Sequence, residues 1–517
     1  MLKIVSCLAI LLAISSCSIP RRIVSGKGDG KIQVVLVQVN DVYEIAPLRG
    51  GREGGMARVA SLKKEMLAKN PNTLLIVAGD FLSPSIYNSL VYQQQRVRGK
   101  QMVDAMNVAG VDLVVFGNHE FDITESELQS RINESAFDWV STNSFQLVDG
   151  KAVPFKKYLS DSSVQEIPRY KIISFTDQDG TIARIAFLGI TLPFNRAEYV
   201  NYSDPLITAK ETFTLLRDSV DAIVAITHQK ISDDILLAQQ IPGLAVVVGG
   251  HEHDMRIEKV DNVFITKAHA NARSAYIVQL DIDVAAKKVS ATPHLRMLNE
   301  STPLDSATSV VVKKWMDVAD SSYGAIGFNA REIVLAAGDS LDGREVSIRN
   351  HPTNFTELIM KSISAASPES ELAIMNSGSV RLDDILYPPI TQYDIIRSLP
   401  YGGSIREVEM KGNLIRQVFE AGKQNKGLGG YLLYDKVRFD DKHNQWLING
   451  QMLDSNRSYR VAISEFLYSG KEENLNFLNK QNPGVIREYP EIQSTANSLS
   501  DIRLAIVRYL ASLASVK

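Results

Sequence analysis

The segment Val-Val-Phe-Gly-Asn-His-Glu-Phe-Asp, residues 114–122, decides the fold of this chain of 517 residues. Its apolar run predicts a buried parallel strand that ends at a glycine, and a tight turn then presents Asn118, His119 and Asp122. Because ligands of α/β sheets bind beyond the carboxyl ends of the strands, we expect these three side chains to reach one crevice. The alternative is that Asn118 and Asp122 only cap the turn or begin the next helix.

Four further apolar runs end in the same way. Residues 32–39, 74–78, 222–226 and 245–248 read as strands, and the residues after them are Asn40-Asp41, Gly79-Asp80, Thr227-His228 and Gly249-Gly250-His251-Glu252-His253. Four of the eight histidines of the chain therefore lie at strand ends. Carboxylates, an amide and imidazoles suit borderline divalent ions such as zinc, manganese or iron. The absence of paired cysteines argues against a thiolate site.

This ordered set of motifs resembles the dinuclear metallophosphoesterases. More narrowly, it is similar to the two-domain 5'-nucleotidase/UDP-sugar hydrolase family, because Gly54-Gly55-Met56-Ala57-Arg58 and the region from residue 329 onward match as well. Alternating strand-like and amphipathic runs from Ile32 to Met297 indicate βαβ units in an α/β domain. The resemblance implies a four-layered α/β/β/α metallophosphoesterase sandwich, followed by an α+β C-terminal substrate-binding domain.

The chain begins with a targeting segment. Lys3, the apolar run 4–13 and Ile14-Ser15-Ser16-Cys17 resemble a bacterial lipoprotein signal, so residues 1–17 are expected to be the signal peptide with Cys17 as the lipidated residue. The alternative is an ordinary secretory peptide cut near Ser16. The apolar run is too short to cross a bilayer as a helix. We expect an exported protein of the cell envelope, anchored through lipid at the outer membrane or the periplasmic face.

The expected domain order follows from composition and from the resemblance. Residues 18–31, with three glycines, predict a flexible tether. The metallophosphoesterase domain is expected at 32–300, a linking helix at 301–328 and the C-terminal substrate-binding domain at 329–517. In the linking segment, apolar residues at helical spacing indicate packing rather than chemistry.

The resemblance also implies the roles of the strand-end residues. Asp41, Asp80 and His253 would bind one divalent metal ion, and Asp80, Asn118, His228 and His251 would bind the other. The two metals would share a bridging hydroxide that attacks the phosphorus. His119 would stabilise the transition state or protonate the leaving oxygen, and Asp122 would orient it. Glu120 and Glu252 are expected behind the ligands or at the surface.

One position departs from the family pattern. The family has Asp-x-His after the first strand, whereas this chain has Asp41-Val42-Tyr43. A phenol has an unperturbed pKa of about 10 and is a poor metal ligand at neutral pH. We therefore expect Asp41, Asp80, His253 and solvent to hold the first metal, with a phenolate ligand as the alternative.

The C-terminal half contains a second set of polar candidate site residues. Arg349 and the motif Asn376-Ser377-Gly378-Ser379-Val380-Arg381 resemble the part of the family's substrate domain that contacts the polar end of the substrate. Guanidinium groups suit phosphate or carboxylate recognition, although surface ion pairing is the alternative for either arginine. By resemblance, Tyr401 and Phe466 would stack on a nucleobase, and Glu472 would stand in for the carboxylate that meets the ribose hydroxyls.

Composition limits the remaining function classes. A net charge of −3 and an aromatic share of 7% describe an ordinary globular protein, and the lack of a basic block argues against a nucleic acid polymer as partner. The leading hypothesis is an exported phosphohydrolase acting on nucleoside 5'-monophosphates or related nucleotides. The alternatives are a 2',3'-cyclic nucleotide phosphodiesterase, a thiosulfohydrolase without the base-stacking aromatics, and a degenerate nucleotide-binding lipoprotein without turnover.

Overall fold

The structure, a computed structural model, describes residues 28–193, 197–492 and 494–514. The expected signal segment with Cys17, and most of the expected tether, lie outside the described residues. The described chain makes its first contacts within the stretch expected as a tether. The Asp29 amide donates to Asp179 Oδ2 at 2.7 Å, and the first strand begins at Lys31.

The N-terminal domain contains two six-stranded mixed sheets. The first sheet has the order β19-β18-β1-β2-β5-β6, and its last four strands are parallel. Its strands are β1 (Lys31–Val39), β2 (Thr73–Val77), β5 (Leu113–Val115), β6 (Asp138–Val140), β18 (Ser274–Asp283) and β19 (Lys288–Met297).

The second sheet has the order β11-β12-β14-β15-β17-β16, in which the four central strands are parallel. Its strands are β11 (Tyr170–Thr176), β12 (Ile182–Thr191), β14 (Ala222–His228), β15 (Val246–Gly250), β16 (Arg256–Val260) and β17 (Val263–Lys267). The carboxyl ends of the parallel strands of both sheets therefore lie at one common edge of the N-terminal domain.

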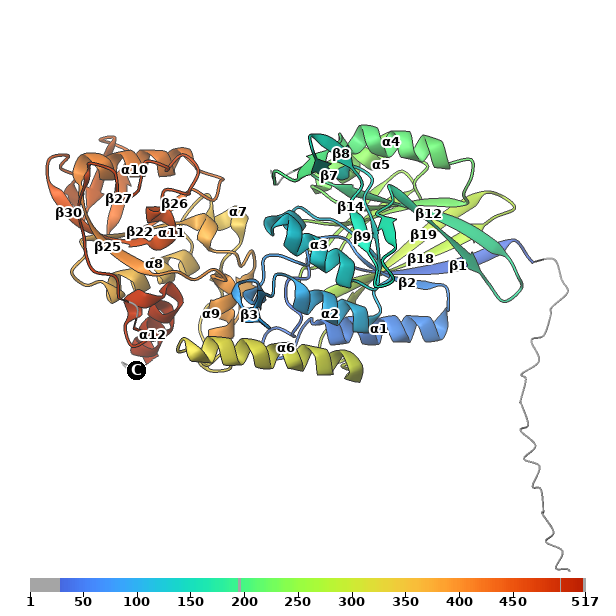
Figure 1. Ribbon diagram of the computed structural model, residues 1–517, viewed down its shortest axis with the longest axis horizontal. Helices are drawn as coiled ribbons and strands as arrows, with labels where there is room; N and C mark the ends of the chain where they lie inside the picture. Colours follow the sequence, from blue (N-terminus) through green and yellow to red (C-terminus); the bar gives the residue numbers. More distant parts are fainter. Residues whose placement is uncertain (1–27, 194–196, 493, 515–517) are drawn as a thin grey trace, which may run out of the picture.

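Helices cover the outer face of each sheet and give four layers (Figure 1). One buried cluster, with Leu36 and Val115 from the first sheet and Phe187 and Ile226 from the second, fills the space between the sheets. Separate cores lie beneath the two helical layers. These helices are α1 (Met56–Lys69), α2 (Lys100–Ala109) and α3 (Glu125–Glu134) on the first sheet, and α4 (Pro205–Leu216) and α5 (Ile231–Gln240) on the second. The predicted α/β/β/α sandwich is confirmed.

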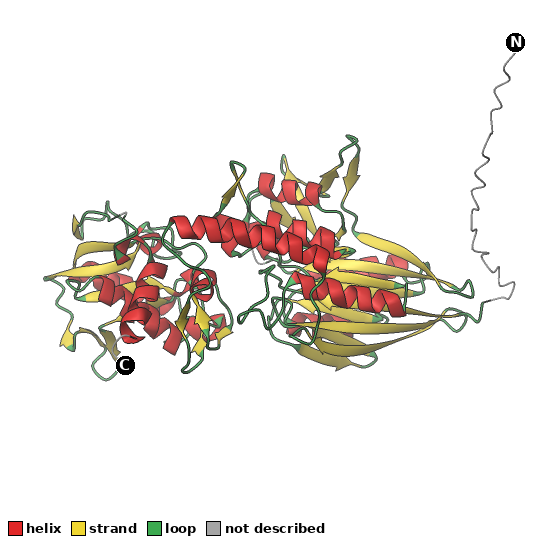
Figure 2. Cartoon of the chain, turned by 90° about the horizontal axis from the view of Figure 1, so that it is seen from below, coloured by secondary structure: helices red, strands yellow, loops and turns green. Residues whose placement is uncertain are grey.

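The helix α6 (Ser306–Ala325) connects the two domains and lies within the expected linking segment. It runs along α1 and α2 toward the C-terminal domain, as Figure 2 shows. Its Trp315 is fully buried and donates from Nε1 to Asp104 Oδ2 at 3.1 Å. The helix is therefore part of the core of the N-terminal domain.

The C-terminal domain has a five-stranded sheet with helices on both faces. The strand order is β26-β22-β30-β25-β31, and only the β22–β30 pair is parallel. Residues alternate along β22 (Leu372–Asn376), so that Ala373 and Met375 pack toward α8 and α12, while Leu372 and Ile374 pack toward α10. The other elements are β25 (Ile405–Lys411), β26 (Leu432–Asp435), β30 (Ser458–Ser464), β31 (Val485–Glu488), α8 (Asn354–Ala366), α10 (Gly412–Gln424) and α12 (Ile502–Ala514).

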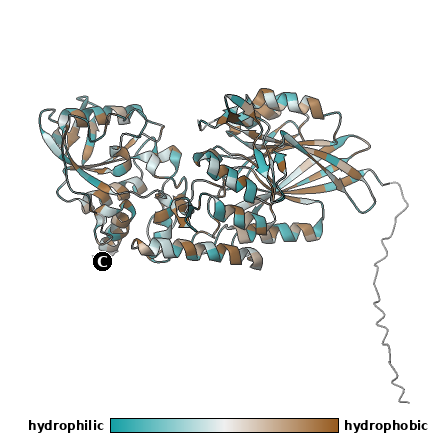
Figure 3. Ribbon diagram, viewed as in Figure 1, coloured by the Kyte–Doolittle hydropathy of each residue, from teal (hydrophilic) through white to brown (hydrophobic). Residues whose placement is uncertain are grey.

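Short elements complete the described chain. They are β3 (Val91–Tyr92), β4 (Gln95–Arg96), β7 (Ser144–Val148), β8 (Lys151–Val153), β9 (Lys156–Tyr158), β10 (Val164–Glu166), β13 (Val200–Tyr202), β20 (Ile333–Leu335), β21 (Leu341–Asp342), β23 (Ile385–Leu386), β24 (Ile390–Thr391), β27 (Val437–Asp440), β28 (Gln445–Ile448), β29 (Gln451–Met452), α7 (Glu345–Ile348), α9 (Gln392–Ser398) and α11 (Glu465–Tyr468), with 3-10 turns at 86–89, 119–122, 377–379 and 498–500. Apolar residues concentrate in the strands of the sheets (Figure 3). Among the described helices, none combines the length and hydropathy that crossing a bilayer requires.

Candidate active site

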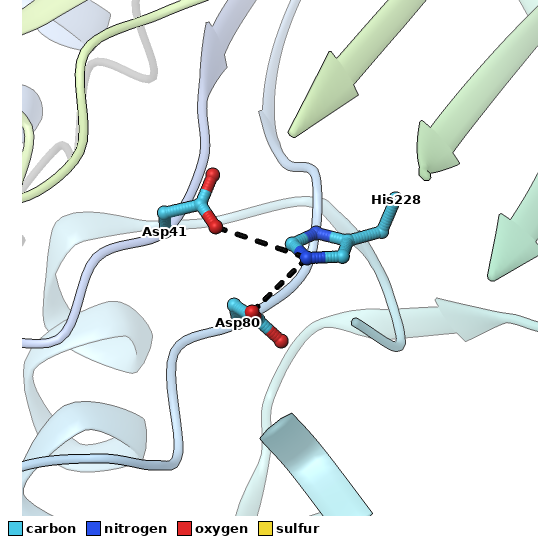
Figure 4. A group of neighbouring side chains, drawn as sticks. All are labelled: Asp41, Asp80 and His228. Atoms are coloured by element: carbon cyan, nitrogen blue, oxygen red, sulfur yellow. Dashed lines mark ion pairs between the residues drawn. The ribbon is translucent and has the colours of Figure 1, made fainter. Parts of the chain in front are cut away.

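The strand-end residues of both sheets meet at one edge of the N-terminal domain. Asp41 and Asp80 follow strands of the first sheet, whereas His228, His251 and His253 end or follow strands of the second. The Nε2 atom of His228 lies 3.0 Å from Asp80 Oδ2 and 3.7 Å from Asp41 Oδ1. Figure 4 marks both ion pairs with dashed lines. His253 Nε2 lies 3.4 Å from the same oxygen of Asp41. Asn118 is buried at the end of the turn after β5.

The backbone of this cluster is strained. Asp41, Asp80, His251 and His253 adopt φ values of 53°, 56°, 95° and 60°. Non-glycine residues in this left-handed region cost about 1–3 kcal/mol each and persist where the surroundings impose them. Gly117 is also required, because a Cβ atom there would lie 2.1 Å from Asp80 Oδ1. The chain therefore stores strain at the positions that aim these side chains at one point.

The two buried carboxylates of the cluster are stabilised by nearby positive charge. Burial raises the pKa of Asp41 and of Asp80, but the charge on His228, together with the charges and hydrogen bonds of the neighbouring histidines, outweighs burial and holds both pKa values below the ordinary range. Burial lowers the pKa of His228, and the two carboxylates in turn raise it to about 9. Burial and the charge of His228 lower the pKa of His251 to about 3. Buried ionised carboxylates beside a neutral imidazole fit divalent cations of the zinc or manganese type.

Tyr43 lies inside this cluster. Its hydroxyl is 2.9 Å from His253 Nε2, 3.1 Å from Asp80 Oδ2 and 3.4 Å from Asp41 Oδ1. Burial and the two carboxylates raise the pKa of Tyr43 well above its ordinary value. The hydroxyl therefore lies within hydrogen-bond distance of the three residues that are expected to bind the first metal.

His119 and Asp122 form a contact beside the cluster. They are the first and last residues of one 3-10 turn, and His119 Nδ1 lies 2.6 Å from Asp122 Oδ2. The His119 amide donates to Asp80 Oδ1 at 2.8 Å, which fixes the turn against the buried carboxylate. Burial lowers the pKa of His119, but the charges of Asp80 and Asp122 outweigh that effect and raise it.

Arg381 of the C-terminal domain faces the same edge. Arg381 and Tyr43 line one small cavity between the domains. Glu345 Oε1 lies 2.5 Å from Arg349 Nη2 and 3.4 Å from Arg381 Nη1, so one carboxylate pairs with both arginines. Asn376 donates to Glu472 Oε2 at 2.7 Å.

Tyr401 and Phe466 lie on neighbouring segments. Their exposed fractions are 54% and 46%, so the rings are available to a ligand. Ser404 donates from its amide and its hydroxyl to Glu465 Oε2, at 3.1 and 3.0 Å. These bonds hold the loop that carries Tyr401 against α11, which carries Phe466.

Comparison with known proteins agrees with this arrangement. Residues 34–255 match the calcineurin-like phosphoesterase family, and residues 333–479 match the 5'-nucleotidase C-terminal domain. The chain belongs to the 5'-nucleotidase family. Its metallophosphoesterase domain makes it a hydrolase, and the family's domain pair accounts for both halves of the described chain.

Individual members of the 5'-nucleotidase family are distant in sequence. Bovine 5'-nucleotidase is 24% identical over 471 residues, which cover 81% of this chain and 78% of that protein. Snake venom 5'-nucleotidase from Naja atra is also 24% identical, over 85% of this chain and 91% of its own length. Two solved structures from Thermus thermophilus share the fold. A 5'-nucleotidase precursor has a TM-score of 0.66 and 20% sequence identity, over 93% of this chain and 97% of that chain. The sulfate thiohydrolase SoxB has a TM-score of 0.63 and 16% sequence identity, over 93% of this chain and 94% of that chain.

Two acidic residues of this 5'-nucleotidase family member have firmer roles than the sequence indicated. Glu120, which is expected behind the ligands or at the surface, is fully buried. It accepts hydrogen bonds from the amides of Gly117, Asp80, Phe81 and Leu82 at 2.6–3.0 Å. Glu252 pairs with Lys267 at 2.6 Å. Glu120 thus locks together the two turns that present Asp80 and Asn118.

Three further residues escaped sequence reasoning. Asp383 and Glu345 contact site residues from a loop and a short helix of the C-terminal domain. Lys267, the last residue of β17, contacts the carbonyls of the residues next in sequence to His228 and His251. Asp383 Oδ2 lies 2.7 Å from His253 Nδ1, across the domain boundary. A contact between residues 130 positions apart leaves no local pattern.

Proposed function

We propose that this chain is an exported, lipid-anchored, metal-dependent phosphohydrolase that releases phosphate from nucleoside 5'-monophosphates or related nucleotides. The observation that carries the proposal is a convergence at one edge of the N-terminal domain. There, the buried carboxylate and imidazole cluster lies next to the His119–Asp122 pair. Arg381 of the C-terminal domain lines a cavity with Tyr43 at the same place.

The ligand set suits two divalent cations. Asp41, Asp80 and His253 would hold the first, and Asp80, Asn118, His228 and His251 the second. His228 Nδ1 lies 2.8 Å from the Ala78 carbonyl, which can only accept, so Nδ1 carries the proton and Nε2 faces Asp80. When bound, two such cations supply a nucleophile at neutral pH and neutralise phosphoryl charge.

His119 is the proton donor in this proposal. Asp122 accepts a hydrogen bond from Nδ1, which fixes the ring and leaves Nε2 to protonate the leaving oxygen. The raised pKa of His119 favours the protonated imidazole that this role requires. The backbone bond from His119 to Asp80 sets the distance between the proton donor and the metal ligands.

The C-terminal domain would bind the rest of the substrate. Arg349 and Arg381 already share the carboxylate of Glu345, and an anionic group of the substrate would compete for the same guanidinium donors. The half-exposed rings of Tyr401 and Phe466 would stack on the base, which tolerates different bases because every base has a π face.

The direct test is product analysis with the purified mature protein, which is loaded in turn with Mn, Zn, Co and Mg. The protein is offered AMP, UDP-glucose, a 2',3'-cyclic nucleotide and a thiosulfate-type conjugate, and free phosphate, nucleotide products and sulfate are each measured. We expect AMP or a related nucleotide to be hydrolysed. Hydrolysis of the cyclic nucleotide alone would favour the phosphodiesterase alternative.

The base-stacking role is tested by Tyr401→Ala combined with Phe466→Ala. KM for AMP should rise far more than KM for a small aryl phosphate, because stacking contributes about 1–3 kcal/mol per base. Equal changes for the two substrates would show that these rings do not bind the base.

A nucleotide-binding lipoprotein without turnover is the second candidate. Tyr43 favours it, because a phenol stands where the family has a metal-binding imidazole and its hydroxyl lies among the ligand atoms. This candidate predicts nucleotide binding in a calorimeter with no phosphate released under any metal. The retained His119–Asp122 pair favours turnover.

Lipid anchoring at Cys17 is tested by Cys17→Ala. Two acyl signals are needed for stable membrane attachment, and a diacylglyceryl group with an amide-linked chain supplies them. We expect Cys17→Ala to leave the membrane fraction as a soluble protein or to accumulate as an unprocessed precursor. Retention in the membrane at the mature mass would show that Cys17 is not the anchor.

A further inference from the structure

A carboxylate of the C-terminal domain completes the surroundings of His253. Asp383 lies between Arg381 and β23, and its Oδ2 atom is 2.7 Å from His253 Nδ1. His253 belongs to the N-terminal domain, where its Nε2 faces Asp41 and Tyr43. The two nitrogens of one ring therefore contact groups from different domains.

The contact has a defined effect on His253 as a ligand. An imidazole that offers Nε2 to a metal must carry its proton on Nδ1, and the group that accepts this proton fixes the tautomer and the ring orientation. Here Asp383 is that acceptor. The orientation of His253 thus depends on the position of the C-terminal domain.

Asp383 has a left-handed backbone conformation. Its φ of 41° lies in a region that aspartate and asparagine enter more readily than other non-glycine residues. Its second oxygen, Oδ1, accepts the amide of Glu345 at the start of α7, at 2.7 Å. The carboxylate of Glu345 pairs with Arg349 and Arg381. Asp383 and Glu345 therefore connect His253 with Arg349 and Arg381.

We propose that Asp383 is a positioning residue that makes the C-terminal domain part of the first metal site. The proposal rests on the proposed function only in taking His253 as a ligand of that metal. Without Asp383, His253 keeps its place in the chain but loses the group that selects its tautomer. The first site then weakens, while the second site, built from Asp80, Asn118, His228 and His251, stays intact.

The variants are chosen from the backbone conformation. Asp383→Gly removes the acceptor without strain, because glycine adopts positive φ freely. Asp383→Asn keeps a weaker, uncharged acceptor at a φ that asparagine tolerates. The matched control is Asp384→Asn, since Asp384 also crosses the domain boundary, where it pairs with Arg273 at 3.1 Å, but it does not contact a metal ligand.

The measurement is a titration of the full mature protein with Co²⁺ alone, followed by calorimetry and visible absorbance. A His253→Ala protein identifies which binding step belongs to the first site. We expect Asp383→Gly to lower the affinity of that step by about 10–100-fold, the usual effect of losing such a partner. Asp383→Asn should lower it less, and Asp384→Asn should leave it unchanged. The second step should be the same in the wild type, Asp383→Gly, Asp383→Asn and Asp384→Asn.

A second readout uses the reciprocity of linked equilibria. Filling the first site should slow hydrogen exchange in the peptide that contains the Glu345 amide, in the wild type and in Asp384→Asn. Asp383→Gly should abolish this slowing. Thermal unfolding of the metal-free proteins verifies that all variants fold.

Two results would overturn the proposal. One is wild-type Co²⁺ affinity at the first site in Asp383→Gly. The other is an equal loss in Asp383→Gly and Asp384→Asn, which would assign the effect to domain docking in general. Because no substrate is present, these results are independent of whether the protein hydrolyses nucleotides.

Discussion

His119 touches both the buried carboxylate cluster and Asp122, and this predicts distinct effects for neighbouring substitutions. His119→Ala should lower kcat by roughly 10²–10⁴, the usual contribution of a positioned proton-transfer group, because the leaving oxygen loses its donor. Metal content should remain near that of the wild type, as measured by elemental analysis. Asn118→Ala is the comparison, and it should instead reduce occupancy of the second metal. An unchanged rate for His119→Ala would remove this residue from the mechanism.

Tyr43 allows a test of the first metal site. Its hydroxyl lies 2.9–3.4 Å from atoms of Asp41, Asp80 and His253, and ligand atoms around one cation with bonds of about 2.0–2.2 Å are separated by similar distances. We therefore expect Tyr43→Phe to weaken the first metal on the order of 10–100-fold, by analogy with outer-shell effects.

Tyr43→His is the matched variant, because an imidazole binds these ions at neutral pH without first losing a proton. It should tighten the first site relative to wild type in the same metal titration. Full metal content in Tyr43→Phe would show that the hydroxyl only packs against the ligands.

The predictability of individual residues depended on local sequence. Asn118 and His228 each end an apolar run, so their place at one edge of the fold followed from the strand pattern. Glu120 also lies in such a motif, but its four amide donors come from two separate turns, and only the folded chain shows them. Asp383 sits in an unremarkable loop of the other domain, and its contact with His253 depends on how the domains dock.

Strand β17 ends in a buried lysine that joins three neighbouring elements. Lys267 Nζ contacts the carbonyls of Gln229 and Gly250 at 2.5 and 2.8 Å, next in sequence to His228 and His251. It also pairs with Asp234 of α5 at 2.8 Å and with Glu252 at 2.6 Å. Its side chain is fully buried, so these four contacts replace hydration.

Removal of this charge should be costly. Lys267→Met leaves two carboxylates without their cation and should lower the free energy of unfolding by about 3–5 kcal/mol. Urea unfolding of the metal-free protein measures this value. Lys259→Met, on the exposed face of the adjacent β16, is the control and should have little effect. A loss no larger than that of the control would show that Lys267 does not stabilise this edge.

The elements themselves were largely predictable, and their layering was not. Apolar runs marked β1, β2 and β5 of the first sheet and β14 and β15 of the second, and helical spacing marked α6. Nothing in strand periodicity assigns β1 to one sheet and β14 to the other, because both are buried on two faces. The four layers came from the family resemblance.

The two domains share a buried acidic residue at their boundary. The Tyr393 hydroxyl of α9 donates to Glu44 Oε2 at 2.6 Å. Burial raises the pKa of Glu44 to about 7, against the opposing effects of Tyr393 and Arg397. Between its ordinary pKa of 4.5 and about 7, the folded protein holds a proton that the unfolded chain releases. The free energy of unfolding therefore falls as pH rises through this window.

Glu44→Gln should remove that pH dependence. The variant should match the wild type near pH 5 and exceed its stability at pH 8 by about 3 kcal/mol, since each pKa unit corresponds to 1.36 kcal/mol. Urea unfolding of metal-free protein across this range measures the difference. Glu300→Gln, at an exposed position, is the control. Parallel pH profiles for Glu44→Gln and wild type would contradict the assignment.

The order of the site residues along the chain has a consequence for biosynthesis. Two separate sheets contribute, with Asp41 and Asp80 from the first and His228 to His253 from the second. No nascent fragment that ends before residue 253 contains the whole set, and parallel pairing between distant strands forms late. Metal capture by the whole set must therefore follow synthesis of residue 253 and pairing of the strands of both sheets. The ions available where folding finishes, rather than the intrinsic order of affinities, then decide which metal the protein acquires.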